Sequence, residues 1–295
     1  LALSRGVHLV FDHADLPVRN TVVMRTHDSR RISALPLGQY TYIGTTDDYH
    51  PECEYWPPVT EQDVDYLLSS TRRVMPEANL TADRIVSVWS GIRPLVGDGS
   101  GRASKELSRK DEVWTSPSGL LSVGGGKLSA YRAMAERVVD TLIDNHAFAA
   151  RPCSTAEVPL PGGERVTLAT ALKGVDEVQA ERLARLYGTE APELADAVSE
   201  NGLVAAEVGQ AVLHEGAQRL EDYWVRRSSR AWFDQGAGLA HLPQAASAMA
   251  ALLGWDEARQ TAEIQNCRDI DRDSRAGFTT GTSYSGDADD VRAAG

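Results

Sequence analysis

The chain has 295 residues, of which 42% are hydrophobic, and its formal net charge is −12 at pH 7. This length suits two ordinary domains, or one large and one small, and the apolar fraction excludes disorder as the default state. The negative balance argues against nucleic acid as a main partner, because binding to its phosphates needs a basic face. Local basic clusters could still bind a small anion.

The cysteines, Cys53, Cys153 and Cys267, are far apart and form no C-x-x-C pair. They therefore indicate neither a zinc site nor a disulfide framework, and we predict no metal site; they are typical of a reducing, cytosolic setting. No apolar run approaches the ~20 residues of a membrane-spanning helix, and no signal peptide is visible. The chain begins at Leu1 and runs directly into a strand-like segment, so we expect it to be part of a longer protein.

The first part of the chain predicts successive strands. Apolar, β-branched and aromatic residues concentrate at 7–11, 20–24, 31–35 and 41–46, and His27-Asp28-Ser29 indicates a hairpin turn. Several strands in a row favour an antiparallel or mixed sheet. Thr60 then opens a helix that Pro76 ends, and a further strand is predicted at 85–89. Residues 97–112 form a polar, glycine-rich loop.

A strand at 120–123 leads through a run of glycines into a helix from about 129 to 145. Strand, glycine turn and helix make half a unit of a nucleotide-binding layer. A linker rich in proline and glycine follows. Beyond it nearly everything predicts helix, over roughly 176–187, 191–200, 203–214, 219–233 and 243–266, before a polar tail that begins at 276.

The glycine turn, Gly124-Gly125-Gly126-Lys127, is not a phosphate loop. The motif G-x-x-x-x-G-K-[ST] fails, because Leu121 stands at its first glycine and Leu128 at its final hydroxyl. What remains is a turn that delivers backbone N–H groups at a helix N-terminus, which attracts anions or electron-rich carbonyls. The turn could equally serve only to pack strand against helix. A complete G-x-G-x-x-G fingerprint is absent from the chain, since Arg102 replaces the third glycine after Gly97 and Gly99.

Two arginines and a histidine are candidate site residues. Arg93 precedes Pro94 after a predicted strand, where it would point out of the sheet end, and Arg109 lies in a short basic stretch. Arginine suits bidentate phosphate contact, but either residue could instead form a surface ion pair. His8 lies inside a predicted strand. It could be a catalytic base or a core residue whose hydrogen bonds are satisfied. The later arginines at 226, 227 and 230 predict a solvated or interdomain face of ion pairs.

Several segments, taken in their order along the chain, resemble one family, the FAD-dependent, quinone-linked glycerol-3-phosphate dehydrogenases. The N-terminal stretches that carry the resemblance are Gly6-Val7-His8-Leu9-Val10, Tyr42-Ile43-Gly44-Thr45-Thr46-Asp47, Trp89-Ser90-Gly91-Ile92-Arg93-Pro94-Leu95 and Gly125-Gly126-Lys127-Leu128-Ser129-Ala130-Tyr131-Arg132. The helical part adds Pro159-Leu160-Pro161-Gly162-Gly163, Leu186-Tyr187-Gly188, Glu221-Asp222 with Arg226-Arg227, and Leu253-Gly254-Trp255. The resemblance covers roughly residues 3 to 270.

The resemblance implies FAD, bound noncovalently, as the cofactor, and oxidation of sn-glycerol 3-phosphate to dihydroxyacetone phosphate, with electrons passed to a membrane quinone. It implies catalytic roles for His8 and Arg93, and substrate-binding roles for Arg93, Arg109 and Lys127. The turn Gly125, Gly126, Lys127, Leu128 and Ser129 would bind the cofactor. Where the family has Gly-Gly-Lys-Leu-Thr-Thr-Tyr-Arg, this sequence has Ser and then Ala130 in place of the two threonines, so a hydroxyl contact at 130 is lost.

The expected fold is a mixture of α+β and α/β. We predict a substrate-binding β-sheet region (1–115), the C-terminal strand–turn–helix of a Rossmann-like FAD domain (116–148), a linker (149–165), an all-helical C-terminal domain (166–275) and a disordered tail (276–295). The missing fingerprint suggests that the fragment alone is inactive. The resemblance also implies a cytoplasmic protein, peripheral on the inner face of the membrane, that could form a homodimer.

Two other functions stay open at this point. One is a flavin amine oxidase of the glycine-oxidase-like group, which shares the fold but needs no set of cations for a phosphate. The other is a noncatalytic module that binds a phospho-ligand or docks a protein. FAD absorbance of the purified protein distinguishes a flavoenzyme from the second of these.

Overall fold

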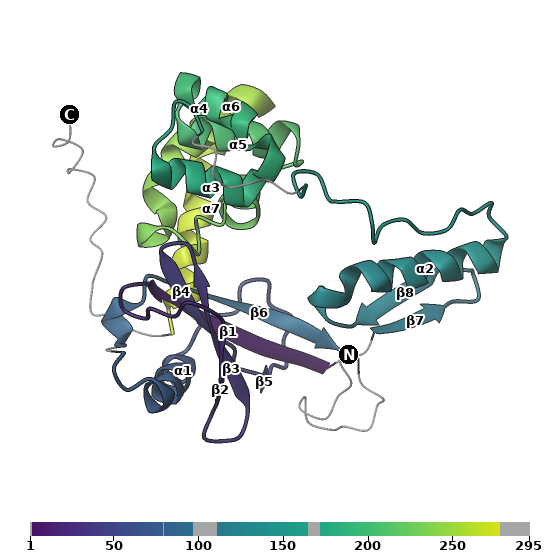
Figure 1. Cartoon of the computed structure of the whole chain (residues 1–295), viewed down its shortest axis with the longest axis horizontal. Coiled ribbons are helices and arrows are strands. Elements are labelled where there is room, and N and C mark those ends of the chain that lie inside the picture. Colours follow the sequence, from purple (N-terminus) through teal and green to yellow (C-terminus); the bar gives the residue numbers. More distant parts are fainter. Residues whose placement is uncertain (1, 79, 97–110, 165–171, 278–295) are drawn as a thin grey trace.

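A computed structural model of the chain describes residues 2–78, 80–96, 111–164 and 172–277. It contains a β-sheet with one covering helix, a β-hairpin with a second helix, and a group of C-terminal helices (Figure 1). The mixed fold and the helical C-terminal part are as predicted.

The large sheet is antiparallel throughout. Its strands are β1 (Ala2–Asp12), β2 (Val22–Arg25), β3 (Arg31–Leu37), β4 (Tyr40–Gly44), β5 (Asp48–Tyr49) and β6 (Ser87–Leu95). They lie in the order β2-β3-β4-β1-β5, and β6 pairs with β1. The sequence interpretation ended the strand before Arg93, and this was wrong: β6 continues through Pro94, opposite Leu3. Proline is tolerated at that position because β6 pairs with β1 alone among the described strands.

One face of this sheet is covered by helix α1 (Glu61–Val74). Thr60 caps the helix as predicted: its hydroxyl accepts from the backbone N–H of Asp63, and the Asp63 carboxylate accepts from the backbone N–H of Thr60. The core between helix and sheet is apolar and includes Val7, Leu9, Phe11, Ile43, Val64 and Leu67. The short helix η1 (Ala82–Arg84) then leads into β6.

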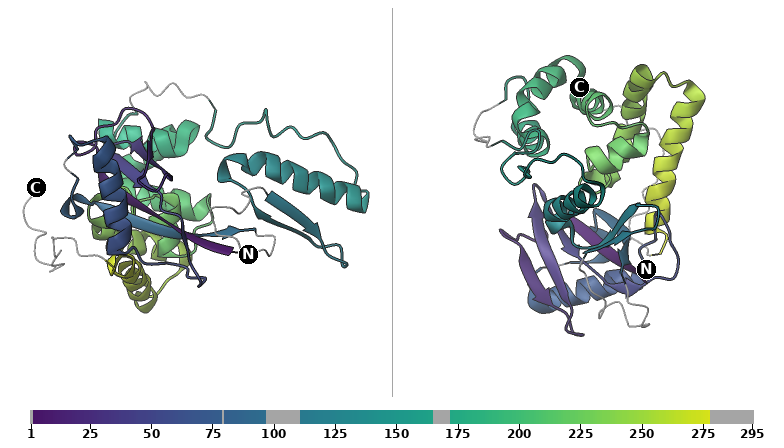
Figure 2. Two further views of the ribbon diagram at one scale, coloured as in Figure 1. Left: turned by 90° about the horizontal axis from the view of Figure 1, so that it is seen from below. Right: turned by 90° about the vertical axis from the view of Figure 1, so that its right-hand side faces the viewer.

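The hairpin is a separate two-stranded sheet. It consists of β7 (Asp111–Thr115) and β8 (Leu121–Gly125), followed by η3 (Leu128–Ala130) and α2 (Tyr131–His146). β7 therefore pairs with the segment after it, although the predicted region boundary lies at residue 115. Figures 1 and 2 show this unit beside the sheet, at the end where β6 finishes.

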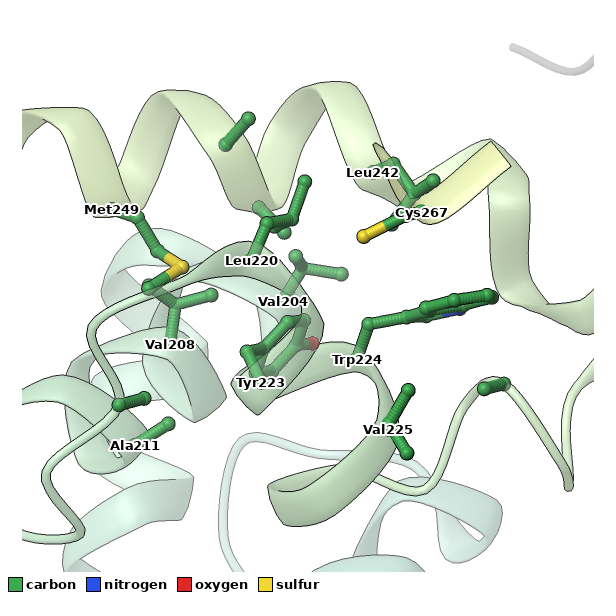
Figure 3. Packing of buried hydrophobic residues seen from close by; sticks show 14 of the residues in the cluster. Val204, Val208, Ala211, Leu220, Tyr223, Trp224, Val225, Leu242, Met249 and Cys267 are labelled. Carbon is green, nitrogen blue, oxygen red and sulfur yellow. The ribbon is translucent and has the colours of Figure 1, made fainter. Parts of the chain in front are cut away.

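The C-terminal helices are α3 (Glu177–Tyr187), η4 (Gly188–Glu190), α4 (Ala191–Asn201), α5 (Leu203–Leu213), η5 (Asp222–Arg227), η6 (Gln235–His241), α6 (Leu242–Leu253) and α7 (Glu257–Arg275). Their largest core contains Tyr223 and Trp224 (Figure 3). From the end of α7, the backbone carbonyl of Ser274 accepts from the N–H of Val59 in the sheet region.

Two predicted helices were too long. Within the 219–233 stretch the helix covers only residues 220–227, of which Asp222–Arg227 form a π-helix. The Ser228 hydroxyl donates to the carbonyl of Tyr223, and Ser229 has a left-handed φ of 54°, which turns the chain away from the helix axis.

The 243–266 stretch is also two helices rather than one. Gly254 ends α6 in the left-handed conformation, with a φ of 71°. Asp256 then caps α7 through the backbone N–H of Arg259.

A buried carboxylate organises the helical part. Glu207 is fully buried and pairs with Arg182 at 2.6 Å and with Arg230 at 2.9 Å, while the Tyr223 hydroxyl donates to it at 3.1 Å. Arg230 forms ion pairs as predicted, but the solvated alternative was wrong for it, because its pairing with Glu207 buries it. Arg226 does form the expected i,i+4 pair, with Asp222.

Removing this carboxylate should strongly destabilise the protein. Glu207→Leu removes the carboxylate partner of Arg182 and leaves Arg230 with Asp234 alone, so the free energy of unfolding should fall by about 3–5 kcal/mol. Tyr223→Phe removes the hydroxyl that donates to Glu207 and accepts from Arg230, and should cost less, about 1–3 kcal/mol. Urea denaturation followed by circular dichroism measures both, and similar losses for the two variants would contradict the central role of Glu207.

Candidate active site

His8 and Arg93 lie on the same face of the sheet, opposite the face that α1 covers. Directly opposite residues of an antiparallel pair project to the same side. The register pairs Ser4 with Arg93, Gly6 with Gly91 and His8 with Trp89. Strand pairing thus brings together two candidate residues that are 85 positions apart in the chain (93 − 8).

Two strand glycines make room for these side chains. A Cβ added at Gly6 would overlap the guanidinium of Arg93, and one added at Gly44 would overlap the imidazole of His8. Glycine inside a strand often marks a close approach of this kind. The guanidinium of Arg93 therefore lies close to the backbone of Gly6, and the imidazole of His8 lies close to the backbone of Gly44.

The guanidinium of Arg93 is held by the segment after β4. Its Nη2 donates to the Thr45 hydroxyl at 2.8 Å, and its Nη1 donates to the Thr46 carbonyl at 3.3 Å. Its Nη1 also lies 3.6 Å from Oδ1 of Asp47. These contacts hold the charge of Arg93 beside His8.

His8 is held in its neutral form. Burial, and secondarily the positive charge of Arg93, lower its pKa to about 4. Its Nδ1 is buried and has no hydrogen-bond partner among the described residues. A neutral imidazole can accept a proton at pH 7, which is what a general base requires.

An aromatic cluster packs around His8. The imidazole stacks on Trp89, with ring centroids 4.7 Å apart and an interplanar angle of 14°. Tyr42 lies 6.1 Å from His8 and 5.5 Å from Trp89, measured between ring centroids. Trp232 and Phe233 reach this cluster from the helical part, at 5.5 Å and 5.6 Å from Trp89.

The predicted cofactor-binding turn lies on the hairpin unit. Gly125 and Gly126 have φ values of 73° and 81°, which glycine adopts most readily. Lys127, Leu128 and Ser129 are exposed, and no side chain of the described residues caps the start of α2. The turn region lies near the end of β6, since a Cβ added at Gly124 would be 3.4 Å from Cγ2 of Val96.

Gly126 also has a packing role. A Cβ there would lie 2.5 Å from Cε of Met134, on the helix that follows. Replacement of Gly126 would therefore disturb the strand–helix contact whether or not a ligand approaches the turn. The packing interpretation and the binding interpretation of this glycine are both compatible with its geometry.

The structure thus places His8 and Arg93 side by side and puts Gly125, Gly126, Lys127, Leu128 and Ser129 on a neighbouring unit. Arg109 lies outside the described residues. Sequence reasoning did not single out the residues that shape the site, namely Gly6, Gly44, Thr45, Trp89, Trp232 and Phe233. Glycines inside predicted strands were the available signal for the first two.

Two family models match the chain. Residues 1–132 match the FAD dependent oxidoreductase family, and residues 153–260 match the C-terminal domain of alpha-glycerophosphate oxidase. Neither match alone spans half of the chain, but together they cover both the sheet and the helical part.

Two curated relatives carry the same name. The aerobic glycerol-3-phosphate dehydrogenase of Bacillus subtilis (strain 168) is 32% identical over 297 residues, covering 92% of this chain and 53% of that protein. The enzyme of the same name from Staphylococcus aureus (strain USA300) is 31% identical, covering 94% of this chain and 54% of that protein. The chain spans about half the length of these curated relatives.

A solved structure agrees with these matches. The X-ray structure of the glycerol-3-phosphate dehydrogenase from Bacillus halodurans complexed with FAD has a TM-score of 0.80 and 30% sequence identity. The match covers 94% of this chain and 58% of that one. Family models, sequence relatives and fold agree: over both its sheet and its helical part, this chain is similar to FAD-dependent glycerol-3-phosphate dehydrogenases.

Proposed function

We propose that this chain supplies the substrate-facing sheet of an enzyme that oxidises sn-glycerol 3-phosphate to dihydroxyacetone phosphate with FAD. The observation that carries the proposal is the adjacency of His8 and Arg93 over Gly44 and Gly6. The substrate carries a phosphate dianion and a secondary alcohol, so it requires a cation and a base near each other.

In this proposal Arg93 binds and orients the substrate, and His8 accepts the proton of its C2 hydroxyl. FAD, when bound, supplies the acceptor for the hydride that leaves C2. The charge of Arg93 contributes to the low pKa of His8. A phosphate dianion near Arg93 would offset that charge, so substrate binding would make His8 a stronger base.

The glycine turn fits a flavin. Its two left-handed glycines and the uncapped start of α2 present backbone N–H groups, which suit electron-rich carbonyls. The exposed Leu128 and Ser129 follow directly. We assign the backbone of this turn to FAD and the side chain of Lys127, with Arg109, to the substrate phosphate.

The matches favour this function over the two alternatives. A C-terminal domain of the alpha-glycerophosphate oxidase type is not expected of a glycine-oxidase-like amine oxidase, and adjacent base and cation groups are more than a docking module needs. We further propose a quinone as the electron acceptor, a cytoplasmic protein peripheral on the membrane, and a homodimer. No helix within the described part of the chain is long and apolar enough to cross a membrane.

Displacement of Arg93 should weaken phosphate recognition. Arg93→Ala removes the guanidinium, and Gly6→Ala should push it aside, because the new methyl group would occupy its place. Each change should cost about 1.5–3 kcal/mol, or roughly a 10- to 100-fold loss in kcat/KM for glycerol 3-phosphate. Steady-state kinetics of the flavin-loaded enzyme that includes this chain measure the effect.

Glycerol and a distant glycine provide the controls. Glycerol lacks the phosphate, so its smaller kcat/KM should change much less in both variants. In Gly209→Ala the new Cβ has no neighbour within 4 Å among the described residues outside its own stretch of helix, so this change should leave both substrates unaffected. Equal losses on glycerol and glycerol 3-phosphate would show a folding defect rather than a lost phosphate contact.

Replacing the base should slow the chemical step. His8→Gln should lower the rate of flavin reduction by about 10²- to 10⁴-fold in single turnover. In the unliganded chain, NMR should show His8 titrating near a pKa of about 4, since burial and Arg93 disfavour its charged form. Arg93→Ala should raise that pKa but leave it below the ordinary value of 6.5. A reduction rate within about threefold of the parent would exclude His8 as the base.

FAD binding tests the role of the absent fingerprint. Because no complete G-x-G-x-x-G occurs in the 295 residues, we expect this chain alone to lose FAD on desalting and to be inactive. The absorbance spectrum after incubation with excess FAD measures retention. A stoichiometric flavin band would show that these residues hold the cofactor without that motif.

A further inference from the structure

His8 is oriented by ring packing. A catalytic histidine is usually fixed by a hydrogen bond to its second ring nitrogen. Here Nδ1 has no such partner among the described residues, and the ring instead stacks on Trp89. Whatever holds Trp89 in place therefore also holds the imidazole.

Trp89 is held by residues of the helical part. Trp232 packs against it at 5.5 Å between centroids and an interplanar angle of 40°. Phe233 meets it edge-on at 5.6 Å and meets Tyr42 in the same way, also at 5.6 Å. Aromatic pairs at these separations contribute beyond the area that they bury.

The segment 228–234, which carries both rings, is itself anchored on two sides. Within the helical part, Arg230 bonds Glu207 and Asp234, at 2.9 Å and 2.6 Å, and Arg182 donates to the Ser228 carbonyl at 2.9 Å. On the sheet side, the hydroxyl of Ser87 donates to the carbonyl of Trp232. These contacts place the two rings over the sheet face that carries His8.

We propose that Trp232 and Phe233 are positioning residues for the reaction: through Trp89 they fix the orientation of the His8 imidazole, so the helical part sets the geometry of the base. This inference rests on the proposed function of His8. It assigns the C-terminal domain a role in catalysis through contact with Trp89 rather than through contact with substrate.

Loosening the cluster should misorient His8 with little change in substrate binding. Trp232→Leu and Phe233→Leu should each lower the rate of flavin reduction roughly 10- to 100-fold, because small misplacements of a reacting group have effects of this size. The KM should stay within about threefold, since Arg93 is untouched. Trp232→Phe, which keeps a ring against Trp89, should restore most of the rate.

The pKa of His8 provides a second measurement, on this chain without cofactor. Opening the cluster should raise the pKa from about 4 toward 6.5, because burial is the main cause of its depression. NMR titration follows the ring, and the His8→Gln spectrum identifies its signal. This readout remains informative even if the protein does not oxidise glycerol 3-phosphate, so failure of the inference and failure of the proposed function are distinguishable.

A double-mutant cycle and a control separate positioning from general packing. In a His8→Gln background, Trp232→Leu should cause no further loss of rate, because no base remains to be positioned. Trp255→Leu, in the same core but stacked with Arg259, should leave both the rate and the His8 pKa unchanged. The inference is overturned if folded Trp232→Leu and Phe233→Leu variants keep the parent rate and pKa, or if the losses multiply in the His8→Gln background.

Discussion

The pairing of β1 with β6 is the constraint on which the candidate site depends. Backbone hydrogen bonds set residues 2–10 against 87–95 in one register, and this puts His8 beside Trp89 and Arg93 beside Ser4. A slip by one residue would turn one strand over and send His8 or Arg93 into the apolar core against α1. That core, which includes Val7 and Leu9, therefore protects the register, and the register in turn builds the site on the opposite face.

The helical part contributes to this site from a distance in the chain. Its buried Glu207 is stabilised by two arginines, one of which, Arg230, lies in the segment that carries Trp232 and Phe233. A buried charge tolerates little movement, because separation from its partners leaves it unpaired in a medium of low polarity. This network anchors the segment that places Trp232 and Phe233 against Trp89, and in our proposal the two regions of the protein therefore share one functional surface.

Glycine has different tasks in the two halves of the site. At Gly6 and Gly44 the absence of a side chain lets Arg93 and His8 lie close to the sheet, and neither glycine has a left-handed φ. At Gly126 the left-handed backbone favours glycine, and a Cβ there would have to displace the end of the Met134 side chain. Gly6 and Gly44 thus allow Arg93 and His8 to be placed close to the sheet, whereas packing alone is enough to explain the glycine at position 126.

Local rules determined much of the fold from the sequence. The strands of the first region, the Thr60 cap, the glycine turn before α2 and most C-terminal helices follow from side-chain periodicity and capping, which act over a few residues. The ordered motifs also indicated His8 and Arg93. Only the tertiary structure decided that Arg93 lies within β6, that Arg230 is buried against Glu207, and that Trp232 and Phe233 pack on Trp89. These contacts join segments that are far apart in the chain. Strand register and the pairing of buried charges determine them, and no local sequence pattern encodes either one.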